Sequence, residues 1–264
     1  GFQLSRWNYN SLDRVKQVVK EMDDAQMPMD VQYGDIDYMD RWMDFTVDET
    51  TYGKQNLSDF VDELHAKGMR YIIILDHCIG KEVGYPPYDK GIEQDIFVKT
   101  KDDENLEGEV WPAVDASVYP DFTLTGATGG ANAWWTELCN DFHDDIAYDA
   151  LWIDMNEPSN FVPGSKTGCE ENNINNPPYL PNILGRQMGN KRGLYDKTIC
   201  MDAKQDWGKH YDVHSLYGHS MSQVTAEALN TVFPKKRSMV LSRSTYVGSG
   251  AYTGHWLGDN QSQW

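Results

Sequence analysis

The feature that most constrains the fold is a repeated alternation between short strand-like segments and segments with apolar residues at helical spacing. Residues 71–75, Tyr-Ile-Ile-Ile-Leu, form a near-continuous apolar run, which is typical of a strand buried on both faces of a parallel sheet. Strands are also expected over residues 2–9, 29–35, 150–153, 238–242 and 255–259, and helices over 12–22, 57–64, 134–148 and 220–229. This alternation predicts an α/β protein with parallel strands.

Two long polar stretches interrupt the alternation. Residues 80–128, after the third expected strand, and residues 159–207, after the fourth, are rich in Gly, Pro, Asp or Asn. The first also contains short apolar runs, so we expect insertions rather than linkers. The chain begins at Gly1 without Met and ends at Trp264 just after a strand-like segment. We therefore expect one domain over residues 1–264, truncated at both ends from a longer protein.

The positions of the polar residues favour one of two possible architectures. Parallel strands joined by helices form either an open doubly wound sheet or a (β/α)8 barrel. Asp35, Asp76, Asp154, Arg243 and Asp259 each fall at or just past the end of an expected strand, and these ends converge on one mouth of a barrel. No Gly-rich nucleotide-binding sequence follows the first strand. We predict an incomplete TIM barrel with about six of its eight strands.

Composition excludes some classes of partner. The formal net charge is −18, so the chain repels nucleic acid and anionic membrane surfaces. No apolar run reaches the length of a membrane-spanning helix, so contact with a membrane is expected only through segments outside this sequence. A content of 40% hydrophobic and 24% charged residues is typical of a globular protein.

Cysteine and histidine spacing gives weaker signals. Cys169 and Cys200 flank a polar stretch rich in Asn and Pro, and their spacing leaves a disulfide and two free thiols equally open. No Cys-x-x-Cys pair is present, which argues against a structural zinc site. His210, His214 and His219 lie close in sequence without an obvious acidic partner, so we interpret them as loop and helix-surface residues and predict no metal.

One segment carries a strong chemical signal. The apolar run Leu151-Trp152-Ile153 leads directly into Asp154, and a second carboxylate follows at Glu157. Glycoside hydrolysis uses two carboxyl groups, one as nucleophile or base and one as proton donor. The alternative is that Asp154 only caps the loop or helix that follows the strand.

At this point the sequence resembles a known family. The segment 152–158, Trp-Ile-Asp-Met-Asn-Glu-Pro, is similar to the signature of glycoside hydrolase family 31, particularly its lysosomal and intestinal α-glucosidases. The resemblance implies that Asp154 is the nucleophile and that Glu157 supports it. Residues 242–245 and 254–259 resemble the acid/base region of the family, which makes Asp259 the proton donor and places Arg243 and Trp256 in the sugar site.

Further motifs extend the resemblance over nearly the whole chain. Residues 30–39 resemble the second-strand motif of the family, and residues 110–112 with 119–122 resemble another segment. The resemblance thereby assigns substrate binding to Asp35, Ile36, Ile79, Trp111, Trp152 and Met155. One departure is visible, because Asp-His-Cys-Ile at 76–79 replaces the usual Asp-Pro-Ala-Ile and alters the approach to a pocket residue.

Physical requirements accompany these assignments. A nucleophile stays ionised more readily beside a cation, for which Arg243 is the candidate. A general acid needs a raised pKa, and Trp256 and Trp264 are candidates for an apolar environment around Asp259. Asp35 and His255 are candidates for hydrogen bonds to sugar hydroxyls.

The resemblance implies a retaining, exo-acting α-glucosidase that acts on maltose-like oligosaccharides and needs no cofactor. It also implies a disulfide between Cys169 and Cys200, and with it the secretory pathway, either a lysosome or the cell exterior or surface. Sequons at Asn56 and Asn260 are weak signals for a glycoprotein, and we expect Asn260 to be buried. The alternatives are a non-catalytic sugar-binding fragment or relative, and other specificities of the family, namely a trimming glucosidase of the secretory pathway or an α-xylosidase.

Overall fold

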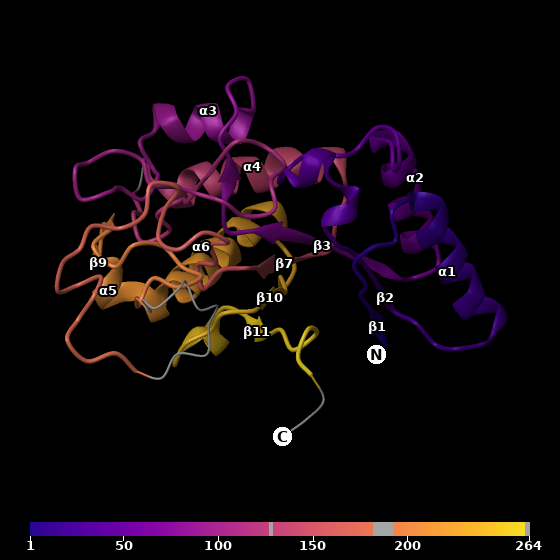
Figure 1. The fold of residues 1–264 in the computed structure, drawn as a ribbon. Coiled ribbons are helices and arrows are strands. Elements are labelled where there is room, and N and C mark those ends of the chain that lie inside the picture. The colour runs from indigo at the N-terminus through magenta and orange to yellow at the C-terminus, as the bar shows by residue number, and fades with distance from the viewer. Residues whose placement is uncertain (127–128, 182–192, 262–264) are drawn as a thin grey trace.

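Six parallel strands form the central sheet of the protein in a computed structural model that describes residues 1–126, 129–181 and 193–261 (Figure 1). The sheet order is β1-β2-β3-β7-β10-β11, and every pairing in it is parallel. The strands are β1 (Gln3–Leu4), β2 (Val31–Gly34), β3 (Arg70–Asp76), β7 (Ala150–Asp154), β10 (Val240–Ser242) and β11 (Gly254–His255). This arrangement confirms the predicted incomplete (β/α)8 barrel.

Amphipathic helices connect consecutive strands, as the apolar spacing predicts. The main ones are α1 (Leu12–Asp24), α2 (Lys54–Ala66), α4 (Ala131–Asp145) and α6 (Tyr217–Val232). Ser11 caps α1 by accepting a hydrogen bond from the Arg14 N–H at 3.3 Å. Helices α4 and α6 pack together, and the Trp135 indole donates to the Thr225 hydroxyl at 3.1 Å between them. These helices cover the sheet and bury its apolar strands.

Strands β3 and β7 are the centre of the core. Ile73, Leu75, Leu151 and Ile153 have no exposed surface, which fits strands covered on both faces. The register pairs Ile72 to Asp76 of β3 with Ala150 to Asp154 of β7, residue by residue. Both strands therefore end in an aspartate at the same level of the barrel.

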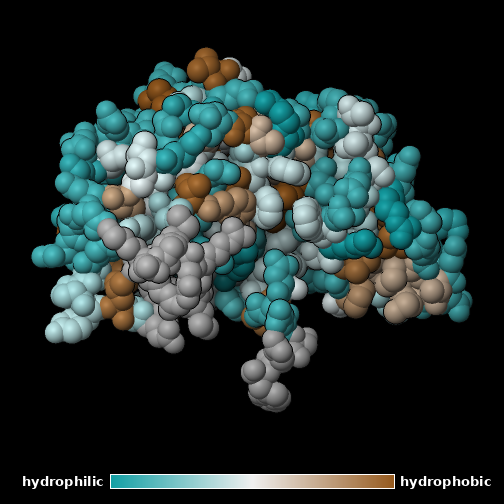
Figure 2. Space-filling view, in the orientation of Figure 1, coloured by the Kyte–Doolittle hydropathy of each residue, from teal (hydrophilic) through white to brown (hydrophobic). Residues whose placement is uncertain are grey.

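The surface is predominantly hydrophilic with separate apolar patches in the view of Figure 2.

Both predicted insertions are present. The first, after β3, contains α3 (Pro86–Glu93) and a small antiparallel sheet of β4 (Ile79–Gly80), β5 (Glu107–Gly108) and β6 (Ser117–Val118). The second, after β7, carries a hairpin of β8 (Lys204–Gln205) and β9 (Gly208–Lys209), followed by the short helix α5 (His210–Val213). Four 3-10 turns complete the described elements: η1 (Ile36–Tyr38), η2 (Asp40–Trp42), η3 (His214–Leu216) and η4 (Ser249–Ala251). Figure 1 shows α1 and α2 on one side of the molecule and the insertions on the other.

Two strands depart most from the sequence pattern, one at each end of the sheet. The expected strand 255–259 is present as β11, but β11 covers only Gly254–His255 and the chain reaches Asp259 through a turn that contains Gly258. The expected strand 2–9 is reduced to β1, because Asn8 adopts a positive φ of 72°. The N–H groups of Asn8 and Tyr9 then bond to the Asp37 carboxylate instead of a neighbouring strand.

Within the described residues, no helix has the length and apolar character needed to cross a membrane.

Candidate active site

The carboxyl ends of the central strands bring the predicted polar residues together. Asp154 is the last residue of β7 and pairs in register with Asp76 of β3. Arg243 follows β10, and its backbone N–H donates to the Ile153 carbonyl at 3.2 Å. Arg243 and Asp154 are therefore fixed on neighbouring strands at the same level, which places the guanidinium beside the carboxylate.

Arg243 bridges the two carboxylates of the signature segment. Its Nη1 lies 3.1 Å from Asp154 Oδ2. Its Nε and Nη2 donate to the two oxygens of Glu157, each at 2.8 Å. This is a bidentate pair, the strongest common geometry between a guanidinium and a carboxylate. Glu157 thus has both oxygens occupied, whereas Asp154 Oδ1 is buried and has no well-formed hydrogen bond among the described residues.

Burial and charge have opposite effects on the two carboxylates. Burial raises the pKa of Asp154 to about 6, and the charges of Glu157 and Asp259 add to this while Arg243 opposes it. Burial also acts on Glu157, but its hydrogen bonds with Arg243 hold the pKa of Glu157 below its usual value. Burial lowers the pKa of Arg243, and the hydrogen bonds with Glu157 raise it. The net change in this pKa is a rise, so the guanidinium stays charged.

Asp35 and Asp259 approach this centre from the two other strands that were expected to contribute. Asp35 follows β2, and its Oδ1 accepts the Ile36 N–H at 2.7 Å. Burial raises the pKa of Asp35 to about 7, with smaller contributions from Asp37, Asp154 and Asp259. Asp259 is exposed in the turn beyond β11, yet its charge acts on both Asp35 and Asp154. The expectation of an apolar environment for Asp259 is wrong within the described residues, and Trp264 lies outside them.

Sequence reasoning missed the residue that fixes the loop between the two carboxylates. Asn156 has no exposed surface, and its amide donates to the Ser242 hydroxyl at 2.9 Å and accepts the Ser244 N–H at 2.9 Å. Met155, which is buried, has a positive φ of 57°. Asn156 therefore ties the β7 loop to the β10 loop and holds Glu157 opposite Arg243.

The predicted tryptophans lie in two aromatic groups. Trp152 and Trp256 pack in a tilted arrangement with ring centroids 4.3 Å apart, and Tyr33 of β2 contacts both. Neither buried indole N–H makes a well-formed hydrogen bond in the described part of the chain, although the Trp152 N–H makes a small contribution that lowers the pKa of Asp154. This group forms an apolar wall inside the barrel between β2, β7 and β11.

The second group contains Trp111 and three aromatic residues that sequence reasoning missed. Trp111 lies 4.9 Å from the Phe161 ring, 6.1 Å from Trp7 and 6.3 Å from Trp42, measured between centroids. The three added rings are 41%, 52% and 40% exposed in the same order. The four come from the β1 loop, η2 and the two insertions, so only the folded structure brings them together. We call Trp7, Trp42, Trp111 and Phe161 the aromatic rim.

The remaining predicted residues are two buried isoleucines and two exposed residues near the end of the chain. Ile36 and Ile79 are buried, at 3% and 1% exposure. His255 is exposed, and its Nδ1 lies 3.0 Å from the Thr245 hydroxyl. Asn260 is exposed, so its expected burial is wrong in the described chain.

His77, the departure noted in the third-strand segment, is buried. Its Nε2 lies 2.9 Å from the Ser159 carbonyl, and its ring packs against those of Tyr119 and Tyr217. Burial lowers the pKa of His77 to about 4, so the ring is neutral at neutral pH. His77 thus links the end of β3 to the start of the second insertion.

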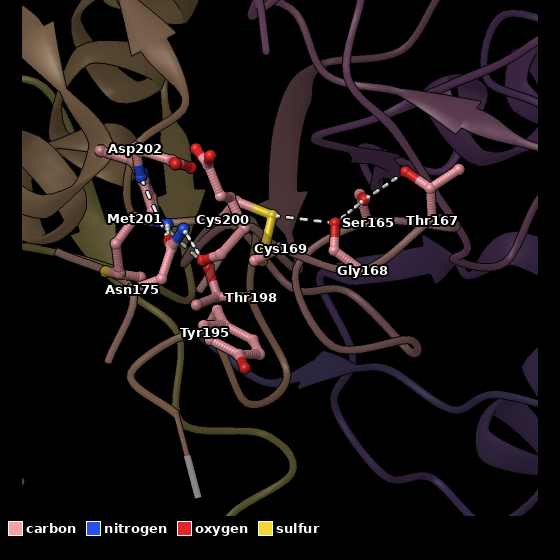
Figure 3. Close-up of a disulfide and its surroundings, with 12 residues drawn as sticks. Ser165, Thr167, Gly168, Cys169, Asn175, Tyr195, Thr198, Cys200, Met201 and Asp202 are labelled. Atoms are coloured by element: carbon pink, nitrogen blue, oxygen red, sulfur yellow. Dashed lines mark hydrogen bonds between the residues drawn. A yellow bond between two sulfur atoms is a disulfide. The ribbon is translucent and has the colours of Figure 1, made fainter. Parts of the chain in front are cut away.

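The implied disulfide is present. Cys169 and Cys200 are bonded, with Cα atoms 5.6 Å apart, and they span the second insertion (Figure 3). Asn175, fully buried between them in sequence, accepts the Met201 N–H at 2.8 Å and donates to the Glu170 carbonyl at 2.9 Å. Together they fix the part of the insertion that the structure describes.

The interpretation of the histidine cluster as surface residues is wrong for His210. Its side chain has no exposed surface, and its Nε2 lies 2.9 Å from His214 Nδ1 and 3.3 Å from the Thr198 hydroxyl. Thr198 in turn donates to the Pro158 carbonyl. Burial lowers the pKa of His210 and His214, so these two histidines form a neutral packing network next to the signature segment.

This barrel, with its aspartates at strand ends, matches one family over its whole length. The family model described as "Glycosyl hydrolases family 31 TIM-barrel domain" matches residues 1–264. The chain belongs to glycoside hydrolase family 31. It is 50% identical over 270 residues to intestinal sucrase-isomaltase of Oryctolagus cuniculus, covering 100% of this chain and 14% of that protein. It is 42% identical over 273 residues to lysosomal alpha-glucosidase of Bos taurus, covering 100% of this chain and 27% of that protein.

Solved structures share the fold. The glucosidase II alpha subunit bound to Glc1Man2 superposes with a TM-score of 0.80 at 30% identity, covering 100% of this chain and 25% of that one. A family 31 alpha-glucosidase from Bacteroides thetaiotaomicron gives a TM-score of 0.71 at 29% identity, covering 100% and 36%. The chain therefore spans about a quarter to a third of the solved chains named here, and a smaller share of sucrase-isomaltase.

Proposed function

We propose that the protein containing this chain is a retaining α-glucosidase with Asp154 as nucleophile and Asp259 as acid/base. The observation that supports this most is the unequal environment of the two Asp154 oxygens. Oδ2 is ion-paired with Arg243, whereas Oδ1 makes no well-formed hydrogen bond within the described residues. A carboxylate with one oxygen held by a cation and the other without a well-formed hydrogen bond has the arrangement that nucleophilic attack requires.

The reaction follows from these positions. Asp154 attacks the anomeric carbon while the bond from that carbon to the leaving oxygen breaks, and Asp259 gives its proton to the leaving oxygen. A glucosyl ester on Asp154 results. Asp259, now a carboxylate, takes a proton from water, and that water hydrolyses the ester and returns Asp154 as a carboxylate. The net configuration is retained because two inversions occur.

Glu157 and Arg243 support the nucleophile rather than exchange protons. Both Glu157 oxygens accept from Arg243, so Glu157 has no oxygen aimed at a leaving group. The bidentate pair fixes the guanidinium, whose remaining Nη1 then stabilises the ionised form of Asp154. Asp35, at the end of β2 beside this centre, is the proposed partner for sugar hydroxyls.

The proposed substrate is a maltose-like oligosaccharide cut at its non-reducing end. Identity is 50% to an intestinal sucrase-isomaltase but 30% to the glucosidase II alpha subunit, which favours the digestive and lysosomal type over the trimming type. The aromatic rim offers apolar faces for sugar rings beyond the scissile bond. The disulfide and the intestinal and lysosomal relatives support a place in the secretory pathway.

Asp259→Ala in the full-length enzyme tests the assignment of the acid. An activated aryl glucoside needs little protonation on departure, whereas the sugar alcohol leaving from maltose needs much. The variant should therefore keep the glucosylation step with the aryl substrate and lose it with maltose. Azide, which needs no base, should restore turnover and give an α-configured glucosyl azide.

Glu157→Gln is the matched control, because it changes the other carboxyl group of the site. We expect it to lower the rates of both substrates by similar factors, with no effect of azide. If azide rescues Glu157→Gln and not Asp259→Ala, the acid role belongs to Glu157 and the proposal is wrong.

A further inference from the structure

The β3 aspartate beside the nucleophile has no part in the proposed reaction. Asp76 ends β3 at the same level as Asp154 ends β7, and the parallel register directs both side chains to the same face of the sheet. Asp76 is 2% exposed, and neither of its carboxyl oxygens has a hydrogen-bond partner among the described residues. A buried carboxyl group of this kind is not a solvated surface charge, so its presence needs another explanation.

A second buried carboxyl group lies against it. Asp44, also 2% exposed, follows η2, and its Oδ1 accepts the backbone N–H of Asp76 at 3.1 Å. Its Oδ2 has no partner within the described chain. Two adjacent buried carboxylates cannot both stay ionised, because each loses hydration and repels the other. The pair therefore holds at least one proton.

The hydrogen bonds indicate which member holds it. Asp44 has an N–H bond that stabilises its anion, whereas Asp76 has none. Asp76 also faces Asp154 and Asp35, two further carboxyl groups from β7 and β2. Both conditions disfavour the Asp76 anion more than the Asp44 anion.

The nearby cation does not change this balance. Arg243, from β10, is already paired with Asp154 through Nη1 and with Glu157 through Nε and Nη2. Burial, followed by the charges of Asp44, Asp154 and Asp35, raises the pKa of Asp76 well above its usual value, and the charge of Arg243 only opposes this. Arg243 thus serves the two carboxylates it contacts.

We propose that Asp76 is a positioning residue for the nucleophile: it remains a neutral carboxylic acid at neutral pH, so that Arg243 is left to Asp154. This rests on the proposed role of Asp154. An ionised Asp76 one strand away, at a spacing of about 5 Å, would raise the pKa of Asp154 by roughly 2 units at an effective dielectric constant of about 20. The proton on Asp76 prevents that shift and keeps the nucleophile ionised.

Infrared difference spectroscopy of the full-length enzyme tests the protonation state without using activity. At pH 7, wild type minus Asp76→Asn should show the carbonyl band of a protonated carboxylic acid. Wild type minus Asp44→Asn should lack that band. A band that disappears in Asp44→Asn and persists in Asp76→Asn would place the proton on Asp44 and overturn the proposal, as would the absence of the band from both differences.

The pH dependence of nucleophile labelling tests the consequence. The rate of inactivation by an activated fluoroglucoside should fall at low pH with the titration of Asp154. Asparagine mimics a neutral Asp76, so Asp76→Asn should leave that midpoint within about 0.3 units. A downward shift of 1 unit or more would show that Asp76 carries a charge in the wild type. If Asp76→Asn does not fold, Asp76→Ser removes the same group and carries the same tests.

The two experiments separate the inference from the proposed function. Labelling of a residue other than Asp154 would refute the nucleophile assignment and with it the positioning role, but the infrared result would still decide the protonation of Asp76. An infrared band on Asp76 together with a shifted midpoint in Asp76→Asn would refute the positioning role alone.

Discussion

Replacing Arg243 with leucine should shift the acid limb of activity and weaken the fold at the same time. Arg243 makes two hydrogen bonds of 2.8 Å to Glu157 and an ion pair of 3.1 Å with Asp154. Asp154 must be ionised to attack, so activity falls as pH drops through its pKa of about 6. Leucine has similar length near the backbone but no charge, so it removes the electrostatic support and leaves both carboxylates unpaired.

The magnitude follows from the contacts. An opposite charge at this range lowers a carboxyl pKa by about 1 to 3 units, so its loss should raise the pKa of Asp154 by that amount. On the acid side of the profile, kcat/KM should fall by about 10- to 1000-fold. Because the site is partly open, the loss of stability should be about 1–3 kcal/mol, below the value for a fully buried ion pair.

The assay is kcat/KM against pH for an aryl glucoside in the full-length enzyme, together with urea unfolding. Arg14→Leu is the control, because it breaks an exposed Arg–Glu pair on α1 and should change stability by less than about 0.5 kcal/mol. An acid limb of Arg243→Leu that coincides with the wild-type limb would refute the electrostatic role of Arg243.

Three other outcomes follow from the structure. Replacing Cys169 and Cys200 by serine should destabilise the protein by about 3–4 kcal/mol, as expected for a cross-link spanning 31 residues, and unchanged urea unfolding would contradict this. The pKa of Asp35 is about 7 in the folded state and lower in the unfolded state, so the free energy of unfolding falls as pH rises from the unfolded pKa to about 7. Asp35→Asn should therefore raise Tm at pH 8 and leave it unchanged at pH 3.5. A variant and a wild type with equal Tm at pH 8 would contradict the burial argument. Phe161→Ala should raise KM for maltose several-fold with little change in kcat, and an unaltered KM would exclude the aromatic rim from substrate binding.

Local pattern was sufficient to predict the barrel and its strand-end aspartates. The run 71–75 and the segment leading to Asp154 each contain their own signal, because burial on both faces requires consecutive apolar residues. The end of β11 could not be predicted, because Trp256 is apolar and looks like strand continuation. Its N–H bonds to the Ser242 carbonyl, after which the chain turns away toward Asp259.

Contacts between distant segments were beyond the reach of sequence pattern. Arg243 and Glu157 are 86 residues apart, and nothing local in either segment specifies a bidentate pair. His210 is polar and close to two other histidines, so the pattern favoured the surface, but its partners Thr198 and His214 satisfy it inside. The aromatic rim likewise needs four separate loops to converge before it exists.

The measurement that tests the central claim most directly is identification of the residue that carries the covalent glucosyl intermediate. The full-length enzyme would be treated with an activated 5-fluoro-α-glucosyl fluoride, digested with protease and sequenced by tandem mass spectrometry. The position of Asp154, with Oδ2 paired to Arg243 and Oδ1 without a well-formed hydrogen bond, predicts a single ester on that residue, and Asp154→Asn should remain folded, unlabelled and inactive. An ester on Asp35, Glu157 or Asp259, or turnover by Asp154→Asn within a few-fold of wild type, would contradict the account.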